Sequence, residues 1–431
     1  MNHFRYLNGA LHAEDVDVAE IAKAVGTPFY CYSTATLTRH YQVFAEAFSD
    51  IDALVCYAMK ANSNQAVLAT LARLGSGVDV VSEGELRRAL AAGIPPSKIM
   101  FSGVGKTKRE IDFALASGIH CFNIESEPEL EVVNSRALAA GTTAPVSFRI
   151  NPDVDARTHA KISTGKKDDK FGISWQDARR VYAHAATLPG IRVTGIDMHI
   201  GSQITDLQPY DDAFRLLREL VETLRADGHT IHHVDLGGGL GIPYRDDNQP
   251  PPEPREYAET VKAHVRDLGC QVIFEPGRMI AGNAGILVSE VLYVKEAGSK
   301  TFVIVDVAMN DLIRPTLYEA WHEIRTVKET PAGAPRIKAD IVGPVCESGD
   351  FMARDRTIPV LEAGDLIAIG SAGAYGAVQS GTYNSRLLVP EVLVKGDRFH
   401  VVRPRPSFDD LLALDHVPDW IDDAQPDPDV A

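Results

Sequence analysis

Eight short apolar segments alternate with helix-like segments between residues 53 and 275, and this alternation limits the possible folds more than any other feature of the sequence. The strand-like segments are residues 53–59, 77–82, 98–102, 120–125, 145–150, 193–200, 232–236 and 271–275. Helical periodicity follows at residues 65–74, 84–92, 108–117, 128–140, 176–188, 209–227 and 255–268. Strands that are apolar on both faces and alternate with helices form a parallel sheet. Eight of them indicate an α/β protein with a closed (β/α)8 TIM barrel, and an open doubly wound sheet is the main alternative.

The pattern changes near residue 285, after which strand-like segments follow one another with turns between them. They are residues 286–294, 301–307, 337–342, 365–369 and 387–395, with one helical stretch at 312–322. The sequence therefore predicts four parts: an N-terminal segment (1–28) that packs with the C-terminal domain, the barrel (29–285), a mostly β C-terminal domain (286–415) and a flexible tail (416–431).

The composition fits a cytoplasmic protein. A net charge of −16 argues against a nucleic-acid partner and against an anionic membrane surface. The N-terminus has no basic region followed by an apolar run, and no apolar stretch is long enough to span a membrane. The five cysteines are odd in number and lack metal-ligand spacing, so we expect reduced thiols and no metal.

Lys60 stands where the first apolar strand of the predicted barrel ends. Burial of its stem would lower the pKa of the amine and make it a better nucleophile toward an aldehyde. A lone lysine at a strand end more often points into water. The other strand ends favour the functional interpretation because they are also polar, and the C-terminal ends of barrel strands share one rim. They carry Asp79 to Ser82, Ser102, Glu125, Arg149, Asn151, His199, Ser202, Gly237 to Gly239 and Glu275 to Arg278.

Three of these strand ends have further chemical meaning. The glycines Gly237, Gly238 and Gly239 follow the seventh strand, where backbone amides of such barrels bind phosphate, although many glycine turns are plain connections. Buried Glu275 needs a cationic partner, which could be a protonated ring nitrogen or Arg278 of the same segment. The ring of His199 could stack on a planar cofactor or be an ordinary core histidine. Lysine, anion cradle, histidine and carboxylate together describe pyridoxal 5′-phosphate held as a Schiff base.

Motifs along nearly the whole chain carry a more specific resemblance. They are YAMKAN (57–62), GVDVVSEGEL (77–86), FSGVGK (101–106), NIESEPEL (123–130), INPDVDARTHAKISTGKKDDKFGIS (150–174), HIGSQI (199–204), DLGGGLGIPY (235–244), EPGR (275–278), MNDLIRPTLYEAWHEI (309–324), GPVCESGDF (343–351) and GAYG (373–376). With these motifs the chain resembles the alanine-racemase-like, fold-type III decarboxylases that use pyridoxal phosphate, and within them the diaminopimelate decarboxylases.

The resemblance implies a role for each cofactor-binding position. Lys60 would form the Schiff base, His199 would stack on the ring, and Glu275 would keep the ring nitrogen protonated. The phosphate would be held by Ser202, Gly237, Gly238, Gly239, the backbone of Gly277 and Arg278, and Tyr375, and Pro276 would also contact the cofactor.

The resemblance also implies the substrate and the assembly. Arg278, Arg314 and Tyr318, with Tyr375, would bind the carboxylate at the far end of meso-2,6-diaminopimelate, and Glu347 would pair with the far ammonium. Cys346 would return a proton after loss of carbon dioxide, and its loop would enter the partner's active site in a homodimer. The alternatives are a sister decarboxylase acting on ornithine, arginine, carboxynorspermidine or a carrier-bound group, and a non-catalytic binding relative.

Overall fold

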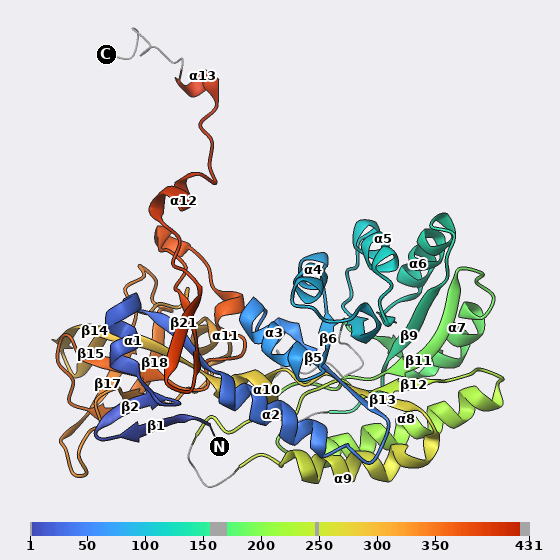
Figure 1. The fold of residues 1–431 in the computed structure, drawn as a ribbon, viewed down its shortest axis with the longest axis horizontal. Coiled ribbons are helices and arrows are strands. Elements are labelled where there is room, and N and C mark those ends of the chain that lie inside the picture. Colours follow the sequence, from blue (N-terminus) through green and yellow to red (C-terminus); the bar gives the residue numbers. More distant parts are fainter. Residues whose placement is uncertain (1, 156–169, 246–249, 423–431) are drawn as a thin grey trace.

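The computed structural model describes residues 2–155, 170–245 and 250–422, and it consists of a barrel and a mostly β domain (Figure 1). The predicted motif at residues 150–174 and the predicted tail at 416–431 lie partly outside the described residues. The two helices at the C-terminal end, α12 (Phe408–Leu412) and α13 (Asp419–Asp422), extend away from the β domain.

Eight parallel strands close into the barrel. They are β5 (Ala53–Ala58), β6 (Gly77–Val80), β7 (Ile99–Phe101), β8 (Cys121–Ile124), β9 (Ala144–Asn151), β11 (Ile191–Asp197), β12 (His233–Asp235) and β13 (Gln271–Phe274). A short strand, β10 (Ile173–Ser174), pairs with β9 outside the ring. Because β13 pairs with β5 and β8 pairs with β9, the ring has no free edge, and the predicted TIM barrel is confirmed over the open sheet.

Helices cover the outside of the barrel, one before the first barrel strand and the others between successive strands (Figure 1). They are α2 (Thr34–Glu46), α3 (Gln65–Arg73), α4 (Glu83–Ala91), α5 (Lys108–Ser117), α6 (Glu127–Ala139), α7 (Ala178–Ala185), α8 (Gln208–Ala226) and α9 (Pro254–Val265). Several start with a polar side chain that accepts a backbone N–H of the first turn, such as Asn64, Ser82 and Ser126. Because these caps start the helices a few residues after the preceding strands, the connecting loops at the rim of the barrel are short.

The second domain is a nine-stranded sheet with a longer path through the sequence. Its strands are β4 (Phe29–Ser33), β14 (Gly285–Ala297), β15 (Lys300–Val305), β16 (Ile324–Thr326), β17 (Arg336–Val342), β18 (Phe351–Pro359), β19 (Leu366–Ile369), β20 (Glu391–Lys395) and β21 (Arg398–Arg403). The N-terminal elements β1 (Phe4–Leu7), β2 (Ala10–Ala13), β3 (Val16–Asp17) and α1 (Val18–Val25) pack on this sheet through an apolar cluster that includes Phe4, Leu11, Ile286 and Val392.

Strand β4 starts at residue 29, the predicted start of the barrel, but it belongs to the β domain. Strand β4 pairs antiparallel with β14 and parallel with β20, so it belongs to the sheet of the β domain and not to the barrel. All five of its residues are buried, which a central strand of either sheet would require. The boundary predicted at residue 29 therefore assigned these residues to the wrong domain, because burial alone does not indicate which sheet a strand joins.

The helix expected over residues 312–322 is shorter in the structure. Helix α11 (Arg314–Tyr318) ends because Glu319 adopts a left-handed conformation with φ of 52°. After this end the chain turns, so that Trp321 lines the cavity described below and His322 lies beside Arg314. The early end of α11 therefore brings His322 next to Arg314.

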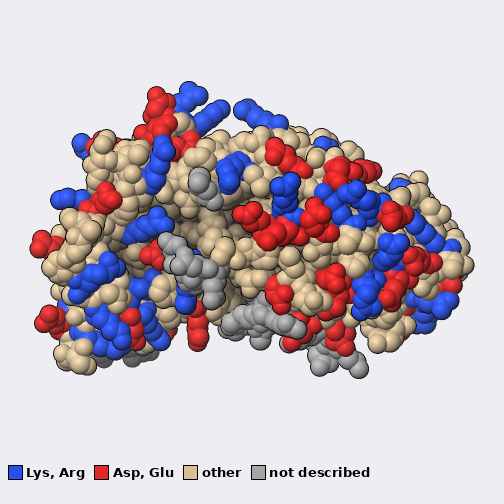
Figure 2. Space-filling model, turned by 90° about the horizontal axis from the view of Figure 1, so that it is seen from below, with Lys and Arg blue, Asp and Glu red and all other residues tan. Residues whose placement is uncertain are grey.

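Charge is unevenly distributed over the surface. On the face shown in Figure 2, acidic and basic side chains are interspersed over the barrel, while Lys and Arg gather at the left end, over the β domain. No helix in the described ranges is long and apolar enough to cross a membrane.

Candidate active site

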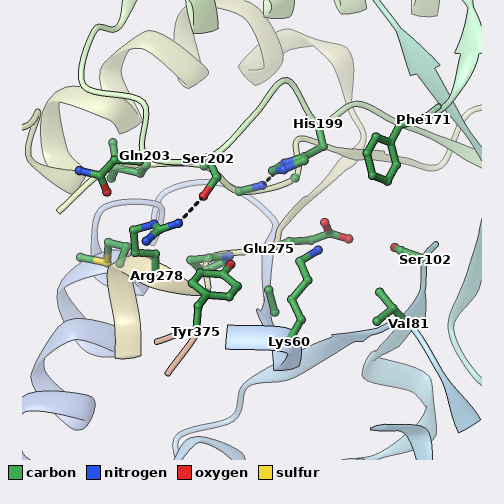
Figure 3. A pocket seen from close by; sticks show the side chains of 18 of the residues that line it. Lys60, Val81, Ser102, Phe171, His199, Ser202, Gln203, Glu275, Arg278 and Tyr375 are labelled. Carbon is green, nitrogen blue, oxygen red and sulfur yellow. Dashed lines mark hydrogen bonds between the residues drawn. The ribbon is translucent and has the colours of Figure 1, made fainter. Parts of the chain in front are cut away.

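A cavity of about 560 Å³ lies at the C-terminal ends of the barrel strands, with residues of the β domain on one side. Figure 3 shows side chains from several strands and loops pointing into it. Most predicted site residues line it, namely Lys60, His199, Ser202, Gly237, Gly238, Gly239, Glu275, Pro276, Gly277, Arg278, Arg314, Tyr318 and Tyr375. The barrel and the β domain together thus bring Lys60 to the same cavity as Tyr375, which lies more than 300 positions further along the chain.

Lys60 projects from a short 3-10 turn that directly follows β5. Its amine reaches into the cavity (Figure 3), and its Nζ lies 3.5 Å from Oδ2 of Asp79. Burial alone would lower the pKa of this amine, but the negative charges of Asp79 and Glu275 outweigh burial and raise the pKa above its ordinary value. The expectation of a lowered pKa was therefore wrong for the protein without its cofactor, because these carboxylates lie closer than the sequence could indicate.

Glu275 is buried at the end of β13 and lies among other carboxylates. Its Oε1 has no hydrogen-bond partner within the described part of the chain. Burial, followed by the charges of Asp235 and Asp79, raises its pKa well above the usual range. Arg278 does not neutralise it, since that guanidinium donates to other groups. The carboxylate therefore fits a ligand that brings a positive charge or a proton, as a pyridine nitrogen does.

His199 presents a neutral ring to the same cavity. Its Nδ1 accepts the backbone N–H of Gly238 at 3.1 Å, which fixes the ring beside the glycine loop (Figure 3). Burial, with the positive charges of Arg149 and Lys60, lowers the pKa of His199 well below its ordinary value. An uncharged flat ring in a fixed orientation is suited to stacking on a planar group.

The glycine loop needs glycine at two positions for steric reasons. Gly237 has a φ of +63°, a left-handed conformation that other residues rarely adopt. At Gly238 a Cβ atom would collide with the backbone carbonyl of Glu275. The loop can approach the end of β13 only without side chains, which leaves backbone amides near the cavity for an anion.

We expect the substitution Gly238→Ala to destabilise the protein by about 1–3 kcal/mol, because the backbone of Glu275 must shift to admit a methyl group. The measurement is the thermal unfolding midpoint without added ligand. Gly381→Ala is the matched control, since a Cβ there has nothing within 4 Å and the residue needs no left-handed conformation. Equal midpoints for the two variants would contradict the close approach.

Arg278 begins α10 (Arg278–Ala281) and is held by neutral groups. Its Nη2 donates to Ser202 Oγ at 3.0 Å (Figure 3) and its Nη1 donates to the Tyr244 hydroxyl at 2.6 Å. The ring of Tyr375 lies 4.8 Å from the guanidinium carbon. Tyr375 itself is fixed by its backbone N–H, which donates to the carbonyl of Ala61 beside Lys60.

Arg314 faces the same end of the cavity and is also buried. Burial lowers its pKa, and the neighbouring positive charge of Arg278 acts in the same direction. Among the described residues neither guanidinium forms an ion pair with a carboxylate. Two buried, uncompensated cations at one end of a cavity are costly unless an anion binds between them.

Cys346 and Glu347 are the two predicted site residues that are absent from the described lining of this cavity. They lie in the loop between β17 and β18, and both are exposed. The loop is ordered by its own contacts: Cys346 N–H donates to Asn384 Oδ1 at 2.9 Å, and Val345 N–H donates to Asp350 Oδ2 at 2.7 Å. The thiol is thus presented outward on a fixed loop.

The structure adds residues to which the sequence analysis assigned no role. Both Asp79 and Arg149 stood in the list of polar strand ends. Arg149 lines the cavity and its Nη1 donates to Glu125 at 3.2 Å, while Asp79 lies behind the lining and contacts Lys60. Tyr244 and Trp321 also line the cavity. No signal in the sequence separates these two from ordinary aromatic residues, since their position depends on loop paths.

The chain is similar to known proteins over nearly its whole length. A family model described as the pyridoxal binding domain of pyridoxal-dependent decarboxylases matches residues 34–282. A diaminopimelate decarboxylase of Vibrio cholerae is 52% identical, covering 97% of this chain and 99% of its own.

Solved structures agree with these sequence matches. A diaminopimelate decarboxylase of M. jannaschii in complex with L-lysine has a TM-score of 0.91 and 37% identity, covering 97% of this chain and 99% of its own. The Helicobacter pylori enzyme with L-lysine has a TM-score of 0.88 and 41% identity, covering 92% and 99%. The chain belongs to the pyridoxal-dependent decarboxylases, in the diaminopimelate decarboxylase family.

Proposed function

We propose that this protein uses pyridoxal 5′-phosphate to convert meso-2,6-diaminopimelate into L-lysine and carbon dioxide, the last step of lysine biosynthesis. The observation that carries the substrate assignment is the pair of buried arginines, Arg278 and Arg314, which face the cavity without a carboxylate partner in the described structure. A second carboxylate, remote from the one that is lost, would supply the missing negative charge. Diaminopimelate carries such a group.

The residues of the cavity fit the cofactor. Lys60 offers its amine, Glu275 offers a buried and unsatisfied carboxylate, and His199 offers a neutral ring. Gly237 to Gly239 offer backbone amides where no side chain could fit. When bound, pyridoxal phosphate supplies an electron sink for the charge that decarboxylation leaves behind.

The chain's own groups then have separate tasks. Lys60 would hold the cofactor through its amine, and Glu275 would hold a proton at the ring nitrogen. His199 would orient the ring, and Ser202, Gly277, Arg278 and Tyr375, which line the cavity, would bind the phosphate. Tyr318 and the two arginines orient the substrate by its far carboxylate.

The site of one subunit is completed by the partner in a homodimer under this proposal. Cys346 and Glu347 have the chemistry of a proton donor and an ammonium partner, yet both are exposed and outside their own chain's cavity. An exposed, fixed loop with these side chains suits a neighbouring subunit's site. The cytoplasmic location stays a prediction from the sequence.

Removing one arginine tests the carboxylate site. We expect Arg314→Ala to raise the KM for diaminopimelate about 100-fold, because a charge-assisted contact is lost, with a much smaller change in kcat. Exposed Arg336→Ala, on the surface of β17, is the matched control and should leave both constants unchanged. An unchanged KM in Arg314→Ala would contradict the assignment of the far carboxylate to this residue.

A sister decarboxylase acting on another basic or carrier-bound amino acid is the alternative. Ornithine and lysine have no far carboxylate, so two uncompensated arginines would serve no purpose for them. The direct test is to incubate the purified protein with pyridoxal phosphate and meso-diaminopimelate and to identify the product. Formation of L-lysine and carbon dioxide in equal amounts would support the proposal. Failure of folded, cofactor-loaded protein to form L-lysine would reject it.

A further inference from the structure

Two like charges side by side in a buried site must be held in place by something other than opposite charge. The positive charges of Arg278 and Arg314 repel each other, because both side chains are buried and both face one cavity. The groups that hold them are therefore informative. If those groups were carboxylates, the arginines would be neutralised before any substrate arrived.

We propose that His322 is the positioning residue of the substrate-carboxylate site, acting as a neutral hydrogen-bond acceptor that orients the Arg314 guanidinium without cancelling its charge. This inference rests on the proposed function and extends it. His322 is absent from the residues that line the cavity, so its effect passes through Arg314.

The contacts of His322 define its protonation. Arg314 Nε donates to His322 Nε2 at 3.3 Å, and the opposite ring nitrogen, Nδ1, lies 2.9 Å from the carbonyl oxygen of Gly370. An arginine Nε can only donate and a carbonyl can only accept, so the hydrogen of the neutral ring sits on Nδ1. The tautomer is fixed from both sides.

Burial keeps this ring neutral. His322 is fully buried, and burial together with the charge of Arg314 lowers its pKa to about 3. It therefore stays uncharged across the whole physiological range. A protonated ring here would lose its acceptor and repel the arginine.

Tyr244 joins His322 to both arginines. Its ring meets the ring of His322 edge-on, with centroids 5.4 Å apart and an interplanar angle of 85°. The guanidinium carbon of Arg314 lies 5.2 Å from the Tyr244 ring centroid, and the Tyr244 hydroxyl accepts from Arg278 at 2.6 Å. Among the described residues, the groups shown to contact the two arginines are thus uncharged, so the positive charge facing the cavity is not neutralised.

The placement of His322 follows from the early end of α11. The left-handed Glu319 terminates the helix, and the chain then turns so that His322 lies eight positions after Arg314 but beside it. A continued helix would carry residue 322 two turns away from residue 314, about 12 Å along the axis. The loop conformation therefore serves the site.

The test compares two amide substitutions that separate the two hydrogen bonds. In His322→Asn the amide nitrogen takes the place of Nδ1 and still donates to Gly370, but nothing reaches Arg314. In His322→Gln the longer side chain places its oxygen near the position of Nε2 and restores the acceptor. We expect the KM for diaminopimelate to rise about 10- to 100-fold in the asparagine variant and about threefold or less in the glutamine variant, with kcat little changed in both.

A second readout does not depend on turnover. Binding of L-lysine, measured by calorimetry on cofactor-loaded protein, should weaken about 10- to 100-fold in His322→Asn and recover in His322→Gln. Binding of 1,5-diaminopentane, which lacks a carboxylate, should be the same in all three proteins. Visible cofactor absorbance and the thermal unfolding midpoint establish that the variants are folded.

These experiments distinguish the role of His322 from the proposed reaction. Equal loss in both variants, or equal weakening of L-lysine and 1,5-diaminopentane, would overturn the positioning role and leave His322 as a packing residue. A wild-type protein that releases no carbon dioxide from diaminopimelate would overturn the proposed reaction, and the L-lysine binding comparison would then still decide the role of His322.

Discussion

Replacing Lys60 by alanine is expected to abolish carbon dioxide release, a loss of at least about 10³-fold, together with the visible absorbance of the lysine-bound cofactor. The reason is that Lys60 is the cavity-lining lysine of the described structure, and its amine points into the cavity toward Glu275 (Figure 3). Among the residues that line the described cavity, no second amine could replace it.

A charge-preserving variant distinguishes chemistry from electrostatics. Lys60→Arg keeps a positive charge near Asp79 and Glu275 but offers no amine that can lose its proton. We expect it to be as inactive as Lys60→Ala. Lys338→Ala, at an exposed surface position, should match the wild type in rate and absorbance. Normal turnover and normal absorbance in Lys60→Ala would remove this residue from the mechanism.

Replacing Cys346 by alanine is expected to slow turnover about 10²- to 10⁴-fold while leaving cofactor binding intact, because a general acid is lost and no cofactor contact is. The thiol is exposed on its loop, unlike the other four cysteines, which are all buried. Cys121→Ala would be a poor control because it opens the core. Cys346→Ser is better, since it keeps a small polar donor of higher pKa and should retain more activity than alanine. Turnover near the wild-type rate in Cys346→Ala would exclude the role.

Mixing subunits tests where Cys346 acts. If each site combines Lys60 of one chain with Cys346 of its partner, a dimer of one Lys60→Ala and one Cys346→Ala chain contains one intact site. Random exchange of subunits should then restore about a quarter of the wild-type activity, since half of the dimers are mixed and each has one of two sites. Absence of recovery in demonstrated mixed dimers would place both residues within one chain.

The sequence predicted the barrel well because its strands are buried on both faces over most of their length. A strand such as Ala53–Ala58 is continuously apolar, and the next three strands in the chain, β6, β7 and β8, are buried throughout, so length and composition identify them. The site followed from the same logic. Once the strands are known, their C-terminal ends must share one rim, and polar residues at those ends must be close in space.

The β domain was harder because its strands are partly exposed. Strand β18 was missed since Arg354, Asp355 and Thr357 point outward and interrupt the apolar pattern. The last part of the predicted 312–322 helix was wrong because one residue, Glu319, adopts a left-handed conformation that no local preference of glutamate indicates.

The electrostatics of the site could not be predicted from the sequence. The pKa of Lys60 depends on how closely Asp79 and Glu275 approach it, and those distances are set by the pairing of β5 with β6 and β13. Likewise, the role inferred for His322 depends on a loop path and on Gly370, which lies 48 positions further along the chain. Patterns of residue types carry no information on either.

The most direct test of the central claim is to compare kcat/KM for carbon dioxide release from meso-diaminopimelate, L-lysine, L-ornithine and L-arginine with the same cofactor-loaded preparation. The account predicts that kcat/KM for diaminopimelate exceeds that for each of the others by at least about 10³-fold. Only diaminopimelate has a second carboxylate for the two arginines, and the other three substrates would leave these buried charges unpaired. A preference for L-lysine, L-ornithine or L-arginine would contradict the claim that Arg278 and Arg314 select a substrate with a second carboxylate.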